Sequence, residues 1–139
     1  MSPEAIVAEM MRKDAFSRWL GIEVLDVGPG FCRLKAAVTP IHCNGFEMAH
    51  GGIAYSLADS ALAFAANSHG RHAVSIETSI AHTRPVVPDQ TVFAEAREMQ
   101  RSTQFGRYAV SLTDERDRTI ALFHGTVFFK ETHWSTPTP

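Results

Sequence analysis

Hydrophobic and polar residues alternate over Phe31–Val38, where every second side chain is apolar. A period of two is typical of a strand that buries one face. Ile22–Val27 has the pattern of a shorter strand, and the turn sequence Gly28-Pro29-Gly30 joins the two. The first third of the chain therefore predicts two consecutive strands.

Most of the C-terminal half also has a sequence pattern typical of strands. Its predicted strands are Ala73–Thr83, Thr91–Gln100, Arg107–Thr113 and Thr119–Lys130. Polar turns separate the last three, so we expect an antiparallel meander. The polar, proline-containing residues 132–139 are expected to form a disordered tail.

Two stretches predict helices. Ser2 can cap a helix that has Pro3 at its first position, and we expect one amphipathic helix within residues 1–20. Residues 51–69 are rich in alanine and leucine and are apolar on nearly every side. A helix of that kind should be buried on most sides.

The order of these elements predicts the fold class. An apolar sheet face and a helix that is apolar on most sides can bury each other if the sheet curls around the helix. We therefore expect an α+β protein with a single hotdog domain over residues 1–131. Its antiparallel sheet would curl around a long central helix, with an N-terminal helix in addition.

Composition narrows the choice of partners. The chain has 139 residues, is 45% hydrophobic and carries a net charge of −2. This charge gives no indication of a basic surface that would bind nucleic acid or an anionic membrane. Cys32 and Cys43 form no CxxC motif, and no run reaches the roughly 18 apolar residues of a membrane span. Acidic residues interrupt the first 20 positions, unlike a signal peptide. We therefore expect a cytoplasmic protein.

One carboxylate interrupts the central helix. Asp59 is the only acidic or strongly basic residue between Gly51 and Gly70. A buried carboxylate without partners is costly, so Asp59 is either paired for structural reasons or retained for chemistry. This makes Asp59 the candidate catalytic residue.

The same helix begins with His50-Gly51-Gly52. The first amides of a helix lack partners and lie at the positive end of its dipole, so glycines there suit an oxyanion, although a tight entry turn also uses glycine. Gly51 and Asp59 are eight residues apart, about 12 Å along a helix. Both can act on one carbon only if two helices lie antiparallel across a two-fold axis, which would require a dimer.

The segment HCNGFEMAHGG at residues 42–52, followed by SLADSA at residues 56–61, resembles the active-site segment of the phenylacetic-acid-degradation thioesterase (PaaI) family of hotdog proteins. Residues 65–70 and Arg84-Pro85 also resemble that family. The resemblance implies an acyl-CoA thioesterase, with (hydroxy)phenylacetyl-CoA or a related aryl-acyl-CoA as the expected substrate. Members of this family are commonly tetramers, so a homotetramer is expected, with a dimer as the alternative.

Carried over by position, the resemblance assigns five catalytic residues. Asp59 would be the general base or the nucleophile, and the Gly51 amide would polarise the thioester carbonyl. Asn44 would orient the carbonyl or the water, and His50 would hold the loop and the helix start. Ser75 would place a hydroxyl near the attacking water.

Coenzyme A brings phosphates, which arginine binds well. Arg84, Arg101, Arg107 and Lys130 are candidate contacts, and we favour Arg84 together with the segment that contains Arg101, Ser102 and Gln104. No metal is expected, because a thioester is already activated, and no cofactor besides the coenzyme A of the substrate is implied.

Other chemistries have less support in the sequence. A Cys43 nucleophile would lack a third orienting group, and the seven histidines do not cluster with metal-binding acids or cysteines. A hotdog dehydratase would need a positioned acid–base pair, usually with histidine, and Asp59 has no evident partner. A non-catalytic acyl-CoA sensor would have no need of an isolated carboxylate.

Overall fold

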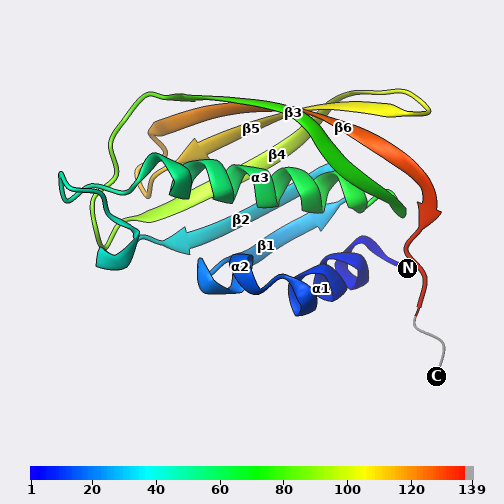
Figure 1. The fold of residues 1–139 in the computed structure, drawn as a ribbon, viewed down its shortest axis with the longest axis horizontal. Helices are drawn as coiled ribbons and strands as arrows, with labels where there is room; N and C mark the ends of the chain where they lie inside the picture. The colour runs from blue at the N-terminus through cyan, green and yellow to red at the C-terminus, as the bar shows by residue number, and fades with distance from the viewer. Residues whose placement is uncertain (137–139) are drawn as a thin grey trace.

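Six antiparallel strands form one sheet that curls around the long helix α3 (Figure 1). The computed structural model describes residues 1–136. The strand order is β1-β2-β4-β5-β6-β3, so β1 and β3 lie at the two edges. The strands are β1 Glu23–Gly28, β2 Phe31–Ala37, β3 Arg71–His82, β4 Thr91–Arg101, β5 Phe105–Thr113 and β6 Thr119–His133. The helices are α1 Pro3–Lys13, α2 Ala15–Trp19 and α3 Gly51–Asn67, with the 3-10 turn η1 at Pro40–His42. The α+β hotdog prediction is confirmed.

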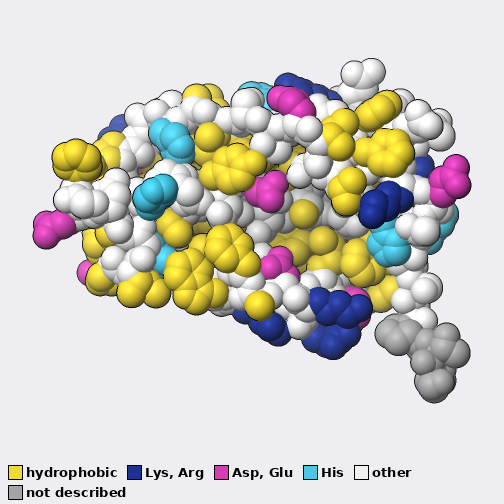
Figure 2. Space-filling view, viewed as in Figure 1, with side chains coloured by type: hydrophobic (Ala, Val, Ile, Leu, Met, Phe, Trp, Pro, Cys, Tyr) yellow, Lys and Arg dark blue, Asp and Glu magenta, His cyan; other side chains and the backbone are white. Residues whose placement is uncertain are grey.

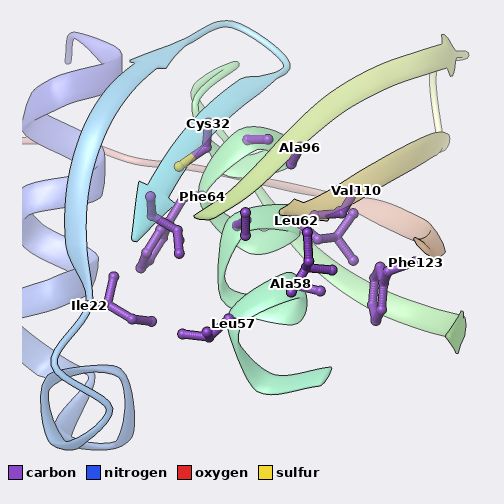
Figure 3. Packing of buried hydrophobic residues seen from close by; sticks show 14 of the residues in the cluster. Ile22, Cys32, Leu57, Ala58, Leu62, Phe64, Ala96, Val110 and Phe123 are labelled. Atoms are coloured by element: carbon purple, nitrogen blue, oxygen red, sulfur yellow. The ribbon is translucent and has the colours of Figure 1, made fainter. Parts of the chain in front are cut away.

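The core lies between α3 and the concave face of the sheet. Leu57, Leu62 and Phe64 project from α3 into this core, and Figure 3 shows Phe64 near Cys32 and Leu62 near Val110. All five of these residues are at most 1% exposed. The alternation over Phe31–Val38 predicted this, since its apolar positions are the ones that face the helix.

Close contact between helix and sheet requires a glycine at one position. A Cβ atom at Gly125 in β6 would lie only 2.8 Å from Cδ2 of Leu62. The glycine therefore lets β6 pass directly over α3, which sets how tightly the sheet closes around the helix.

One side of α3 remains open in the single chain. Tyr55 is 36% exposed, and Asp59 and Ser60 are half-buried. The neighbouring edge strand β3 exposes Val74 and Ile76. Figure 2 shows hydrophobic side chains spread across the middle of this face. The prediction that the helix is buried on most sides therefore holds for its C-terminal part, whereas its N-terminal turns lie at the surface.

The prediction of one N-terminal helix was wrong. The helix is interrupted at Asp14, whose backbone is not helical, with φ −92° and ψ 83°. The Asp14 side chain accepts a hydrogen bond from the Ser17 backbone N–H and caps α2. An aspartate side chain that bonds to a nearby amide competes with helix continuation, which explains the break.

The prediction of a disordered tail from residue 132 was also wrong for Thr132–Trp134. Strand β6 continues to His133, and the Trp134 indole N–H donates to Oδ1 of Asn67 at 2.9 Å. The His72 ring packs edge-on against the Trp134 indole, with ring centroids 4.6 Å apart. These contacts tie the segment to the end of α3. Residues 137–139 of the predicted tail lie outside the described residues.

Candidate active site

Asp59 projects from the open side of α3. Within residues 1–136 its carboxylate takes part in no hydrogen bond and no ion pair, so this part of the chain supplies no structural partner for it. Burial raises the pKa of Asp59 above its usual value, and the negative charge of Asp14 raises it further. A carboxylate in these surroundings is a stronger base than an exposed one.

Asp59 and Ser75 line the same pocket, which has a volume of about 270 Å³. The remaining wall is apolar and consists of Leu62 and Ala63 from α3, Ala73 and Val74 from β3, and Val127 from β6. Asp59 is the only titratable side chain among the residues that form this wall. The structure therefore brings together two of the predicted catalytic residues beside an apolar surface.

His50 caps the start of α3. Its Nδ1 accepts a hydrogen bond from the Gly52 backbone N–H at 2.9 Å, and its own backbone N–H donates to the His42 carbonyl at 2.8 Å. An accepting Nδ1 assigns the ring proton to Nε2 in the neutral imidazole. His50 thus holds the loop and the helix start, which is the position that the resemblance assigned to it.

The Gly51 amide remains free at this helix start. Within the described residues it donates to no acceptor, in contrast to the amide of Gly52. A free first-turn N–H at the positive end of a 17-residue helix suits a developing negative charge.

A second pocket, of about 360 Å³, opens at this helix start. Its polar lining includes His50, Gly51, His82 and Arg84. His82 was missed by the sequence reasoning, and Nε2 of its ring lies 3.3 Å from where a Cβ atom at Gly51 would be. Its position two residues before Arg84-Pro85, at the end of a predicted strand, was the available signal.

Asn44 lies in the loop before α3 and lines neither of these pockets. Its Oδ1 accepts hydrogen bonds from the backbone N–H groups of Phe46 at 2.9 Å and Met48 at 3.4 Å. The side chain thereby shapes the turn, while its Nδ2 group donates to no acceptor within residues 1–136. If Asn44 contacts the substrate, it would therefore do so through Nδ2.

The predicted coenzyme A contacts fall into two separate places. Arg84 follows the C-terminal end of β3 and lines the Gly51 pocket. The β4–β5 turn, which includes Ser102 and Gln104, lies beside the opposite end of β3, where Arg71 Nη1 donates to the Thr103 carbonyl. Since the 12 residues of β3 separate them, the two groups can serve one ligand only if they come from different chains.

The residues at the β4–β5 turn have local partners. Arg101 Nε lies 3.5 Å from Oε1 of Glu98. The hydroxyl of Ser102 bonds to both backbone groups of Phe105, and the Gln104 carbonyl accepts from the Phe129 N–H. These bonds order the turn and leave the Gln104 side chain available.

Two further findings concern other classes of site. No helix within residues 1–136 combines the length and the apolar character needed to cross a bilayer. In the same residues, histidine, cysteine, aspartate and glutamate side chains form no group of three or more that could hold a metal ion.

Gly51 and Asp59 line different pockets of the single chain. Both lie on α3, separated by eight residues or about 12 Å of helix. A single chain therefore contains both the expected oxyanion-binding amide and the expected carboxylate, but they are too far apart to act on the same atom.

Comparisons with known proteins agree with this fold. The thioesterase superfamily matches residues 46–121. The chain is 35% identical over 116 residues to the acyl-coenzyme A thioesterase PaaI of Escherichia coli, an alignment that covers 84% of this chain and 83% of that protein. The solved structure of the E. coli PaaI protein superposes with a TM-score of 0.92 over 94% of this chain and 95% of that one, at 31% identity.

A protein from Thermus thermophilus is similar as well. Its structure, described as the TT0310 protein, gives a TM-score of 0.80 at 38% identity, over 83% of this chain and 97% of that one. The superfamily match spans more than half of the chain and includes both Gly51 and Asp59. This chain therefore belongs to the thioesterase superfamily and, within it, to the PaaI family of hotdog proteins.

Proposed function

We propose that this protein hydrolyses acyl-CoA thioesters at a site that two subunits share. The observation that carries the proposal is the half-buried Asp59, which has no partner within residues 1–136 and lines one apolar pocket with Ser75. The name of the E. coli relative, acyl-coenzyme A thioesterase, supports the reaction. A Streptococcus pneumoniae protein of the same fold, 19% identical, was solved with coenzyme A, which supports a fold able to bind this ligand.

In the proposed reaction Asp59 accepts a proton from a water molecule, whose oxygen attacks the thioester carbon. The carbonyl oxygen becomes an oxyanion and accepts a hydrogen bond from the Gly51 N–H. The carbon–sulfur bond then breaks, the thiolate of coenzyme A leaves and takes up a proton, and the acyl group leaves as a carboxylic acid. Ser75 would hold the water, and the Asn44 amide would orient the water or the carbonyl.

Direct attack by the Asp59 carboxylate is the other route, and it would form an acyl anhydride on the enzyme. A single turnover in water labelled with ¹⁸O tests for the anhydride. Label in Asp59 identifies an anhydride that water attacks at the aspartyl carbon, whereas direct attack by water on the thioester puts label only into the acid product.

The shared site requires a dimer, and the open side of the molecule suits one. Among residues 1–136, strand β3 pairs only with β6, so its other edge offers free backbone groups to a second chain. Val74 and Ile76 on β3 and Tyr55 on α3 are exposed apolar side chains on this side. Two copies paired through this edge would set their α3 helices antiparallel, with Gly51 of one chain near Asp59 of the other. A homotetramer would combine two such dimers.

The acyl group would occupy the pocket beside Asp59. Its apolar wall favours an apolar acyl group over a charged one. An aryl-acetyl group is the expected form, since the E. coli relative comes from the phenylacetic acid degradation operon.

A thioester panel tests the proposal. Aryl-acetyl, short aliphatic and long aliphatic acyl-CoA substrates are compared by the release of free thiol. Wild type should hydrolyse the aryl-acetyl substrates best, and Asp59→Asn should lose at least about 100-fold in kcat while its fold and mass in solution stay unchanged. Asp117→Asn, an equal change of charge in the exposed β5–β6 turn, is the matched control. Full hydrolysis by Asp59→Asn would exclude Asp59 from the mechanism.

A further inference from the structure

The break between α1 and α2 places a second carboxylate close to the central helix. Oδ1 of Asp14 accepts from the Ser17 backbone N–H at 2.9 Å, and Oδ2 accepts from the Ser17 hydroxyl at 2.5 Å. Asp14 is thus fixed at both oxygens. An aspartate that served only as a helix cap would need only the first of these bonds, the one from the backbone N–H.

Ser17 connects Asp14 to α3. The Ser17 side chain is buried, and its Oγ lies 2.9 Å from Oγ of Ser60. Because the Ser17 hydroxyl proton points to Asp14, the Ser60 hydroxyl is the donor in this second bond. Ser60 directly follows Asp59, so a chain of hydrogen bonds links the Asp14 carboxylate to the helix turn that carries the catalytic carboxylate.

The positive side chains next to Asp14 are engaged elsewhere. Lys13 Nζ lies 2.9 Å from Oε1 of Glu9, and Arg18 Nη1 donates to the Arg12 carbonyl at 2.7 Å. The Asp14 charge therefore has no ion-pair partner within residues 1–136. It acts on Asp59 from the side of the N-terminal helices.

On the other side of Asp59, the described residues that line the pocket carry no charge. The pocket wall formed by β3 and β6 contributes Ala73, Val74, Ser75 and Val127, none of which titrates. Burial is the larger cause that raises the pKa of Asp59, and the charge of Asp14 adds to it in the same direction.

We propose that Asp14 is a positioning residue that acts through Asp59: held beside α3 by Ser17 and Ser60, its negative charge sets the pH range in which Asp59 works as a base. The proposal rests on the proposed function, in which Asp59 is that base. A negative neighbour makes the deprotonated state of Asp59 less favourable, which strengthens the base and moves the acid limb of the activity profile to higher pH.

The test replaces the Asp14 charge and keeps the cap. Asparagine and serine cap helices about as well as aspartate, so Asp14→Asn and Asp14→Ser should fold. In both variants the acid limb of kcat/KM should move to lower pH, and the shift should be largest at low ionic strength. A role of Asp14 in folding alone would lower the melting temperature or kcat without moving this limb.

Asp117→Asn is the charge-matched control. It changes the net charge by the same amount, and Asp117 is not among the charges that act on Asp59. Its acid limb should coincide with that of wild type. A shift equal to that of Asp14→Asn would overturn the proposal, because net charge rather than the placed carboxylate would then be the cause.

A readout besides activity separates this proposal from the proposed function. With ¹³C-labelled aspartate, the Cγ signal of Asp59 is assigned from its loss in Asp59→Asn and is titrated in wild type and in Asp14→Asn. A lower midpoint in Asp14→Asn supports the proposal, and an unchanged midpoint overturns it. Failure of wild type to hydrolyse any thioester would overturn the proposed function alone.

Discussion

The imidazole of His82 lies against Gly51, with Nε2 3.3 Å and Cε1 3.4 Å from the place that a Cβ atom at residue 51 would occupy. A Cβ atom at residue 51 would therefore need the His82 ring to move by a few tenths of an ångström. Gly51→Ala should lower kcat at least about 10-fold, because the methyl group would displace the imidazole or the amide that we propose stabilises the oxyanion. Steady-state kinetics with an aryl-acetyl-CoA substrate measures the loss.

Two variants control for this prediction. Gly28→Ala meets open space and should behave as wild type. The double variant Gly51→Ala/His82→Ala removes the contact and should recover part of the activity if crowding is the cause. A double variant no better than Gly51→Ala would mean that the added methyl group acts on the amide or the substrate directly.

Mixed subunits test the shared site. Neither Asp59→Asn nor Gly51→Ala chains should hydrolyse the substrate well by themselves. After subunit exchange, one site of each mixed dimer would combine a good Asp59 with a good Gly51, so activity should rise toward half of the wild-type value per mixed dimer. Mass spectrometry of the intact assembly confirms the exchange, and exchange without any gain would rule out a site built from both chains.

Arg84 lines the pocket of the Gly51 amide, and it is the proposed contact for a phosphate of coenzyme A. Arg84→Ala should raise KM for an acyl-CoA roughly 10-fold, the worth of a charge-assisted hydrogen bond. The matching acyl-pantetheine lacks the nucleotide phosphates, and its KM should hardly change. Arg116→Ala in the exposed β5–β6 turn is the control. Equal losses with both substrates would contradict a phosphate contact.

Glu98 joins α3 to the sheet at the end remote from Gly51. Its Oε2 lies 2.5 Å from His69 Nε2 and accepts from the buried Tyr108 hydroxyl at 2.8 Å. Burial opposes the charged form, but the hydrogen bonds from His69 and Tyr108 outweigh it and lower the pKa of Glu98 below its usual value. Glu98→Gln should therefore destabilise the fold by about 1–3 kcal/mol at pH 7.

The pH dependence of this loss has a defined sign. A carboxyl group whose pKa is lower in the folded state contributes stability above its unfolded pKa, about 4.3, and loses it as the pH falls through the folded value. The gap between wild type and Glu98→Gln should shrink as the pH falls below about 4, as measured by urea unfolding. A gap that stays constant from pH 7 to pH 3 would show that the charge of Glu98 contributes nothing.

The sequence alone determined the layered fold and pointed to the candidate catalytic residue. Alternation over Phe31–Val38, the apolar helix at residues 51–69 and the isolated Asp59 are local patterns, and burial imposes such patterns directly on neighbouring positions. If Gly51 and Asp59 act on the same carbon, their eight-residue spacing requires a second chain, because the helical rise is constant.

Only the tertiary structure decided which distant residues meet. The N-terminal helix is interrupted at Asp14, and nearby Ser17 contacts Ser60, 43 positions away in the sequence. His82 lies over Gly51 because β3 runs beside the start of α3. Trp134 is ordered, contrary to the prediction of a tail, because its indole N–H donates to Asn67. Arg84 and Arg101 lie far apart because the 12 residues of β3 separate them. Contacts of this kind depend on packing between elements, and no local period in the chain encodes them.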